Sequence, residues 1–82
     1  MDKNRKNARY WLINADRQAF EDILYHAKIT PRQQKIIELR ILKNIEIVKI
    51  AQMMNLSEET IQRDIKRSYD LISKSLIKSK FI

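Results

Sequence analysis

Apolar residues recur along the chain at intervals of three, four and seven positions, which is the spacing of one helix face. The first such face consists of Tyr10, Ile13, Phe20, Ile23, Leu24 and Ala27. Asp16 can cap a second segment inside this stretch, which therefore forms either one helix or two. We expect Tyr10 and Trp11 to pack in the core, with base stacking or a dimer contact as alternatives. Residues 1–9, which carry four basic side chains and one acid, are expected to begin as a frayed basic arm.

A sharper helix start follows at Thr30. Thr30 stands at the N-cap, Pro31 at the first helical position and Gln33 at the third, which is the arrangement of a capping box. The predicted buried stripe of this helix consists of Ile36, Ile37, Leu39, Ile41 and Leu42. Asn44 is a plausible left-handed stop.

Two further helices are predicted on either side of a break at 55–57. The short one runs from about Glu46 to Met54 and buries Ile47, Ile50, Ala51 and Met54. Asn55 suits a sharp turn because asparagine tolerates the left-handed conformation, and Ser57 is a good N-cap for the next helix. The apolar stripe of that last, long helix consists of Ile61, Ile65, Tyr69, Ile72 and Leu76.

The pattern as a whole predicts an all-α fold, a four- or five-helix bundle. Within it, a helix-turn-helix spans roughly Ile45 to Leu76, and its long C-terminal helix is the recognition helix. We expect one compact domain in which residues 1–29 form the basic arm plus a helix and residues 30–82 carry the helix-turn-helix.

With Ile61 facing inward, the first two turns of the last helix direct polar side chains outward. These are Ser57, Glu58, Glu59, Thr60, Gln62, Arg63, Lys66 and Arg67. Glutamine, arginine and glutamate are groups that read adenine, guanine and cytosine edges, and the cations also suit phosphates. A merely solvated helix face is the alternative, but the position on a helix-turn-helix favours double-stranded DNA.

The composition favours a polyanionic binding partner and contains few of the residue types that catalytic and metal sites use. Lys and Arg number 17 against 10 Asp and Glu, a net charge of +7. There is no cysteine, no glycine and one histidine, His26, so we expect no metal site, no cofactor and no enzymatic activity. Apolar runs are far shorter than the ~18 residues of a membrane span. We therefore expect a soluble, cytoplasmic protein that does not bind membranes.

Several of these motifs together resemble the promoter-reading C-terminal domain, region 4, of bacterial sigma factors. The resemblance rests on Thr30-Pro31-Arg32-Gln33 followed by Ile36-Ile37-Glu38-Leu39-Arg40, then Ile50-Ala51, and Leu56-Ser57-Glu58-Glu59-Thr60-Ile61. The stretch is more loosely similar to LuxR-type DNA-binding domains. The resemblance implies that Glu58, Glu59, Thr60, Gln62 and Arg63 face bases. It also implies that Arg32, Lys43, Lys49 and Lys66 contact backbone phosphates.

We expect a stand-alone regulator rather than an initiation factor, because 82 residues cannot hold the other domains of a sigma factor. Its isoleucine-, lysine- and asparagine-rich composition suggests a phage or mobile element as the source. Small helix-turn-helix proteins usually bind two half-sites, which favours a homodimer. The last residues, from Lys74 to Ile82, form a basic amphipathic end that could contact DNA, a membrane surface or a second subunit. The acidic pair Glu58-Glu59 motivates the alternative of a module that docks on RNA polymerase, an activator or an anti-sigma-type partner.

Overall fold

The computed structural model describes the backbone of residues 3–79 and the side chains of residues 7–76. The described backbone forms five α-helices and one π-helical turn. They are α1 (Lys3–Asn14), α2 (Arg17–His26), α3 (Pro31–Ile37), the π-helical turn η1 (Glu38–Leu42), α4 (Ile47–Met54) and α5 (Glu58–Ser79). The predicted all-α class is confirmed, in its five-helix form.

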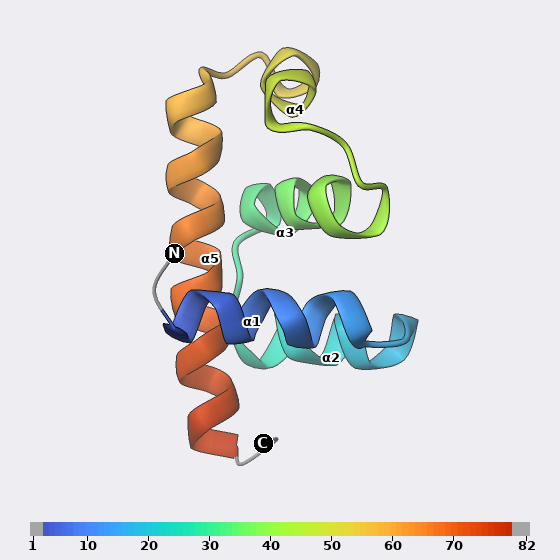
Figure 1. The fold of residues 1–82 in the computed structure, drawn as a ribbon, viewed down its shortest axis with the longest axis vertical. Coiled ribbons are helices and arrows are strands. Elements are labelled where there is room, and N and C mark those ends of the chain that lie inside the picture. Colours follow the sequence, from blue (N-terminus) through green and yellow to red (C-terminus); the bar gives the residue numbers. More distant parts are fainter. Residues whose placement is uncertain (1–2, 80–82) are drawn as a thin grey trace.

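Helix α5 organises the molecule because it runs along the long axis while the other helices lie across it (Figure 1). Helix α4 lies at one end of α5, α3 with η1 lies at the next level, and α1 and α2 lie further along (Figure 1). Each of α1, α2, α3 and α4 contacts α5. A single helix therefore supports every other element of the fold.

The N-terminal third contains two helices rather than a basic arm and one helix. Helix α1 begins at Lys3, so most of the expected arm is helical. Asp16 caps α2, and its side-chain oxygen accepts a hydrogen bond from the Ala19 amide at 2.8 Å. The Asp16 cap therefore settles the open choice between one helix and two.

The predicted buried face of the first helix is wrong in its first half. Tyr10 is 63% exposed and Ile13 is 51% exposed, whereas Ala8 and Leu12 are 0% and 1% exposed. Trp11 is partly buried against the core. The break at Asp16 makes the helical phase before it independent of the phase after it, so Tyr10 and Ile13 do not share a face with Phe20. Ala8 and Leu12, one turn apart, face the core instead.

The helix that begins at Thr30 changes its winding after Ile37. Its capping box is present as predicted, with the Thr30 hydroxyl accepting from the Gln33 amide and the Gln33 side chain accepting from the Thr30 amide. The Lys43 amide then reaches back five residues to the Glu38 carbonyl at 3.2 Å. The wider turn shifts the side-chain phase, and Leu42, predicted to be buried, is 42% exposed. Asn44 has a φ of 53°, which confirms the predicted left-handed stop.

The predicted inward faces of the last two helices are confirmed. Ile50 and Ala51 of α4 are buried, and Ile47 and Met54 are packed against the core. All five predicted residues of the α5 stripe are buried in the same cluster as the core residues of the other helices. No helix within residues 3–79 is both long enough and apolar enough to span a membrane. The side chains of 77–82, which belong to the predicted amphipathic end, lie outside the described residues.

Candidate nucleic-acid interface

The turn between α4 and α5 is built by Asn55. Its φ of 56° and ψ of 45° place it in the left-handed region, as its position in the sequence predicts. The Asn55 amide donates to the Gln52 carbonyl at 3.3 Å, and the Leu56 amide donates to the Ala51 carbonyl at 2.9 Å. These bonds satisfy carbonyls at the end of α4 and reverse the chain direction within a few residues.

Ser57 caps the start of α5. Its hydroxyl oxygen accepts from the Thr60 amide at 3.1 Å and lies 2.9 Å from the Thr60 hydroxyl. Glu58 and Glu59 occupy the first turn, where the positive end of the helix dipole stabilises acidic side chains. The hydroxyls of Ser57 and Thr60, both predicted to read bases, therefore already have a partner in each other.

The outward face predicted for the first turns of α5 is open to solvent. Thr60 is partly buried, and the other members are exposed: Ser57, Glu58, Glu59, Gln62, Arg63, Lys66 and Arg67. Ile61 and Ile65 point into the core between them. The residues assigned to bases and those assigned to phosphates on α5 thus lie on one exposed surface of one helix.

Arg32, predicted as a phosphate contact, forms an ion pair with Asp64 of α5. The Nε atom of Arg32 lies 2.8 Å from Oδ2 of Asp64, and its Nη2 donates a hydrogen bond to Oδ1 at 3.1 Å. The contact to Oδ2 is short but lacks hydrogen-bond alignment, so Oδ1 is the hydrogen-bonded oxygen. The Asp64 side chain is 2% exposed and that of Arg32 is 52% exposed. The pair joins the first turn of α3 to the inner side of α5.

Asp64 was missed by the sequence prediction because only apolar residues were assigned to the inner face of α5. The helical spacing did indicate an inward position for Asp64, since this residue follows Ile61 by three positions and adjoins Ile65. Ser68, one turn further on, is also buried, and its hydroxyl donates to the Asp64 carbonyl oxygen at 2.7 Å. Inward polar residues of this kind are satisfied by specific partners.

Lys43 and Lys49, the remaining predicted phosphate contacts, are both exposed. Lys43 follows η1, and Lys49 lies in the first turn of α4. Lys43 therefore lies just before the helix-turn-helix and Lys49 within its first helix, whereas Arg32 lies at the start of α3.

Tyr69 is buried on α5, the helix against which α1 packs. Burial raises the pKa of its phenol above the ordinary value of 10.0, and the charges of Arg9 and Arg40 oppose that rise. A side-chain hydrogen bond from Arg9 also favours the phenolate. The charges of two guanidinium groups from different elements thus act on one buried hydroxyl.

Within the described residues, no three or more His, Cys, Asp or Glu side chains cluster in a way that could hold a metal ion. Nδ1 of His26 lies 2.9 Å from the Asp22 carbonyl oxygen on the same helix. The exposed face of α5 carries carboxylate, amide and cationic side chains.

A comparison with known protein families identifies the domain that has this arrangement of helices. The model of sigma-70 region 4 matches residues 27–71, which include α3, η1, α4 and the greater part of α5. No curated protein and no solved structure matches the chain. The match covers more than half of the chain, and region 4 is a DNA-binding helix-turn-helix domain. The chain therefore belongs to the sigma-70 region 4 family and binds DNA through this domain.

Proposed function

We propose that the protein is a small stand-alone transcriptional regulator that binds a specific double-stranded DNA sequence with the start of α5 in the major groove. The observation that carries the proposal is the exposed face of α5, which follows directly on the α4 turn and combines hydrogen-bonding and cationic side chains. A major groove about 12 Å wide admits one helix and presents a distinct pattern of donors and acceptors for each base pair.

In this proposal the base-reading residues lie in the first two turns of α5. They are Ser57, Glu58, Glu59, Thr60, Gln62 and Arg63. Gln62 and Arg63 suit adenine and guanine, and either glutamate can accept from a cytosine amino group. Because the hydroxyls of Ser57 and Thr60 already contact each other, we assign the larger share of base discrimination to Gln62 and Arg63.

The proposed phosphate contacts surround this segment. They are Arg32, Lys43, Lys49, Lys66 and Arg67. Arg32 can contact Asp64 and a phosphate at the same time. About half of its side chain stays exposed while it pairs with Asp64, and a guanidinium has five N–H donors. Phosphate contacts of this kind orient a protein on the duplex without carrying sequence information themselves.

The test begins with selection of bound sequences from a random duplex pool, followed by titrations of the selected site. Arg63→Ala should cost about 1–3 kcal/mol of discrimination at one base pair, because it removes a bidentate base contact. Lys66→Ala, its matched control on the same helix, should weaken all sequences alike and reduce the salt slope by about 1. If Arg63→Ala leaves both affinity and base preference unchanged, the assigned recognition segment is wrong.

The same selection tests the proposed homodimer. A dimer with two equivalent recognition helices should select a palindromic site, with half-sites about one helical turn apart. Light scattering should then show twice the chain mass in free solution or on the site. A single half-site bound by one chain would contradict the dimer.

A second candidate function is docking on a protein such as RNA polymerase. Two observations favour it: the acidic Glu58-Glu59 pair, and the exposed Val48 and Met53 of α4, which are 48% and 52% exposed. DNA binding must weaken steeply as salt rises, because bound cations release counterions from the duplex. Absence of duplex binding at low salt would leave protein docking as the better proposal.

A further inference from the structure

The helix-turn-helix and its family match leave α1 and α2 without a role, since the match begins at residue 27 and α2 ends at His26. Helix α1 has no acidic residue between Lys3 and Asn14, and its sequence in this range includes Lys3, Arg5, Lys6 and Arg9. Arg9 is the only one of these four whose side chain is described, and it is exposed. Its position therefore decides whether α1 can contribute to the DNA-binding surface.

Arg9 is held in place by the core rather than left as a free surface charge. It hydrogen-bonds to the hydroxyl of Tyr69, which is 3% exposed and belongs to α5. One donor of the guanidinium is thus used, and the others face outward from an exposed side chain. Arg9 is therefore positioned by the recognition helix itself.

A second guanidinium charge acts on the same hydroxyl. Arg40 of η1 acts on Tyr69 by its charge, and its own Nη1 donates to the Ile45 carbonyl oxygen at 3.4 Å. Within residues 7–76, neither Arg9 nor Arg40 has a carboxylate partner, unlike Arg17 and Arg32. Two cations whose charges act on one buried hydroxyl, and which lack an ion-paired acid among these residues, suit an anion with several acceptor oxygens.

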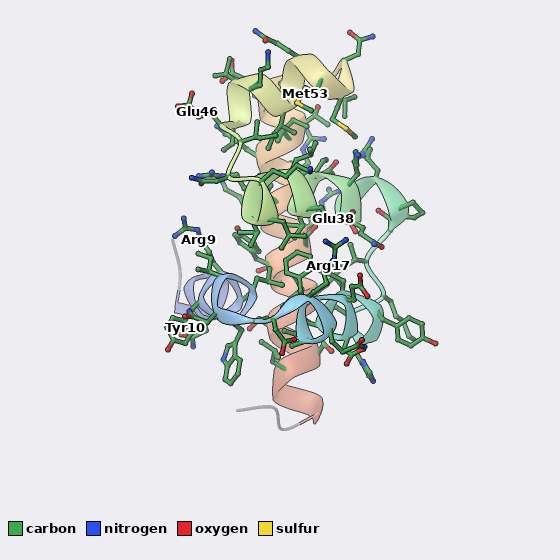
Figure 2. All side chains as sticks on the ribbon, turned by 90° about the vertical axis from the view of Figure 1, so that its right-hand side faces the viewer. Arg9, Tyr10, Arg17, Glu38, Glu46 and Met53 are labelled. Carbon is green, nitrogen blue, oxygen red and sulfur yellow. The ribbon has the colours of Figure 1, made fainter. Side chains whose placement is uncertain are left out.

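Arg9 lies on the side of the molecule where α4, the first helix of the helix-turn-helix, begins. Figure 2 shows Arg9 and Glu46 along the same edge, with Arg9 at the level between α1 and η1. Glu46 is the N-cap of α4, whose first turn carries Lys49, and Lys43 lies in the loop before it. Two of the proposed phosphate contacts thus lie in the segment that runs from Arg40 to α4.

The length of α5 between its first turn and Tyr69 is close to the distance between the floor of a major groove and the phosphates that border it. Tyr69 follows Thr60 by nine residues, or about 13 Å of helix. A groove about 12 Å wide and 8.5 Å deep places its bordering phosphates about 10 Å from the centre of its floor. The side chain of Arg9 is long enough to span the difference between this rise of α5 and the distance from the groove floor to the phosphates.

We propose that α1 supplies Arg9 as an additional contact to a DNA backbone phosphate, beside Arg40 and outside the family-matched domain. The N-terminal helix then extends the binding surface beyond the helix-turn-helix, and Tyr69 holds Arg9 in register with α5. This inference rests on the proposed DNA-binding mode, which the experiment below tests separately.

The experiment measures binding of a 20-base-pair duplex containing the selected site between 50 and 200 mM salt, for the full chain and its variants. Arg9→Gln removes the charge but keeps an N–H donor for Tyr69. Loss of one phosphate contact should reduce the salt slope by about 0.9, so the affinity deficit should be about 3.5-fold larger at 50 mM than at 200 mM. The deficit should be the same for selected and mixed sequences, and Arg9→Lys should restore the slope.

Arg17→Gln is the matched control, because Arg17 is exposed on α2, pairs with Glu21 and lies away from the edge that carries Arg9 (Figure 2). Equal losses for Arg17→Gln and Arg9→Gln would overturn the proposal and indicate an effect of net charge alone. A folded Arg9→Gln protein with wild-type affinity and slope would also overturn it, while the proposed function stands. Failure of the wild-type chain to bind the duplex would overturn both.

Discussion

Asn55 and Asn44 show how this chain makes sharp turns without glycine. Both have positive φ values, 56° and 53°, in a sequence that contains no glycine at all. A left-handed conformation costs an L-residue roughly 1–2 kcal/mol, which asparagine partly avoids through local hydrogen bonds of its side chain. The turn before α5 thus keeps a residual strain that a glycine would remove.

Asn55→Gly should therefore stabilise the protein by about 0.5–1 kcal/mol, because relief of the left-handed strain exceeds the added entropy of the unfolded chain. Asn7→Gly is the matched control, since Asn7 is exposed inside α1 and the same substitution should there destabilise by about 0.3 kcal/mol, the difference in helix propensity between the two residues. Urea unfolding of the three proteins measures both changes. A loss of stability in Asn55→Gly would show that the Asn55 side chain contributes more than its backbone costs.

At the scale of elements, the Arg32–Asp64 pair links α3 to α5. Because Asp64 is 2% exposed, Arg32→Met should leave a buried carboxylate without its partner and cost about 1–3 kcal/mol of unfolding free energy. Asp64→Leu alone should cost less, since the exposed Arg32 can return to water. The double substitution should recover much of the loss, because a well-packed apolar pair often equals a buried ion pair in stability.

A double-mutant cycle by urea unfolding gives the coupling between the two side chains. DNA affinity measured on the same four proteins separates two roles of Arg32. If Arg32 acts only through Asp64, the double variant should bind as tightly as the wild type. If Arg32 also contacts phosphate, the double variant should be stable yet bind with a salt slope reduced by about 1. Additive changes in stability would contradict the link between α3 and α5.

The helices that carry their own start and stop signals were predictable from the sequence. Thr30, Asn44, Asn55 and Ser57 act through hydrogen bonds or dihedral angles within a few residues, so their effects are visible in a short stretch of sequence. Tyr10 and Leu42 were placed wrongly because the phase of a helix face continues only while the winding is regular. The cap at Asp16 and the π-helical turn each reset that phase.

The polar contacts between elements were not predictable in the same way. Arg32 and Asp64 are 32 residues apart, and Arg9 and Tyr69 are farther apart still. Nothing in the local pattern distinguishes these residues from the other charged and aromatic residues of the chain. Their pairing depends on how α1 and α3 cross α5, which is a property of the packed core. The exposed outward face of α5, by contrast, was predictable because helical spacing alone separates it from the buried stripe.

At the scale of the whole molecule, Tyr69 reports on the packing of α1 against α5. Burial raises the pKa of its phenol above 10.0, so between the unfolded and folded pKa values the folded chain binds more protons than the unfolded one. The stability that Tyr69 contributes is therefore complete below about pH 10 and lost as the pH rises through the folded pKa.

Tyr69→Phe should remove this alkaline loss, because phenylalanine has no proton to release. Unfolding free energies of the wild type and the variant, measured in urea from pH 8.5 to 11.5, should diverge only above about pH 10, the ordinary value for a tyrosine. Lysine titration affects both proteins alike and cancels in the difference. In a titration followed by phenolate absorbance, the contribution of Tyr69 should appear at higher pH than the contributions of the other tyrosines. Parallel curves over the whole range would mean that the phenol of Tyr69 is not buried when it ionises, because the α1–α5 packing opens first.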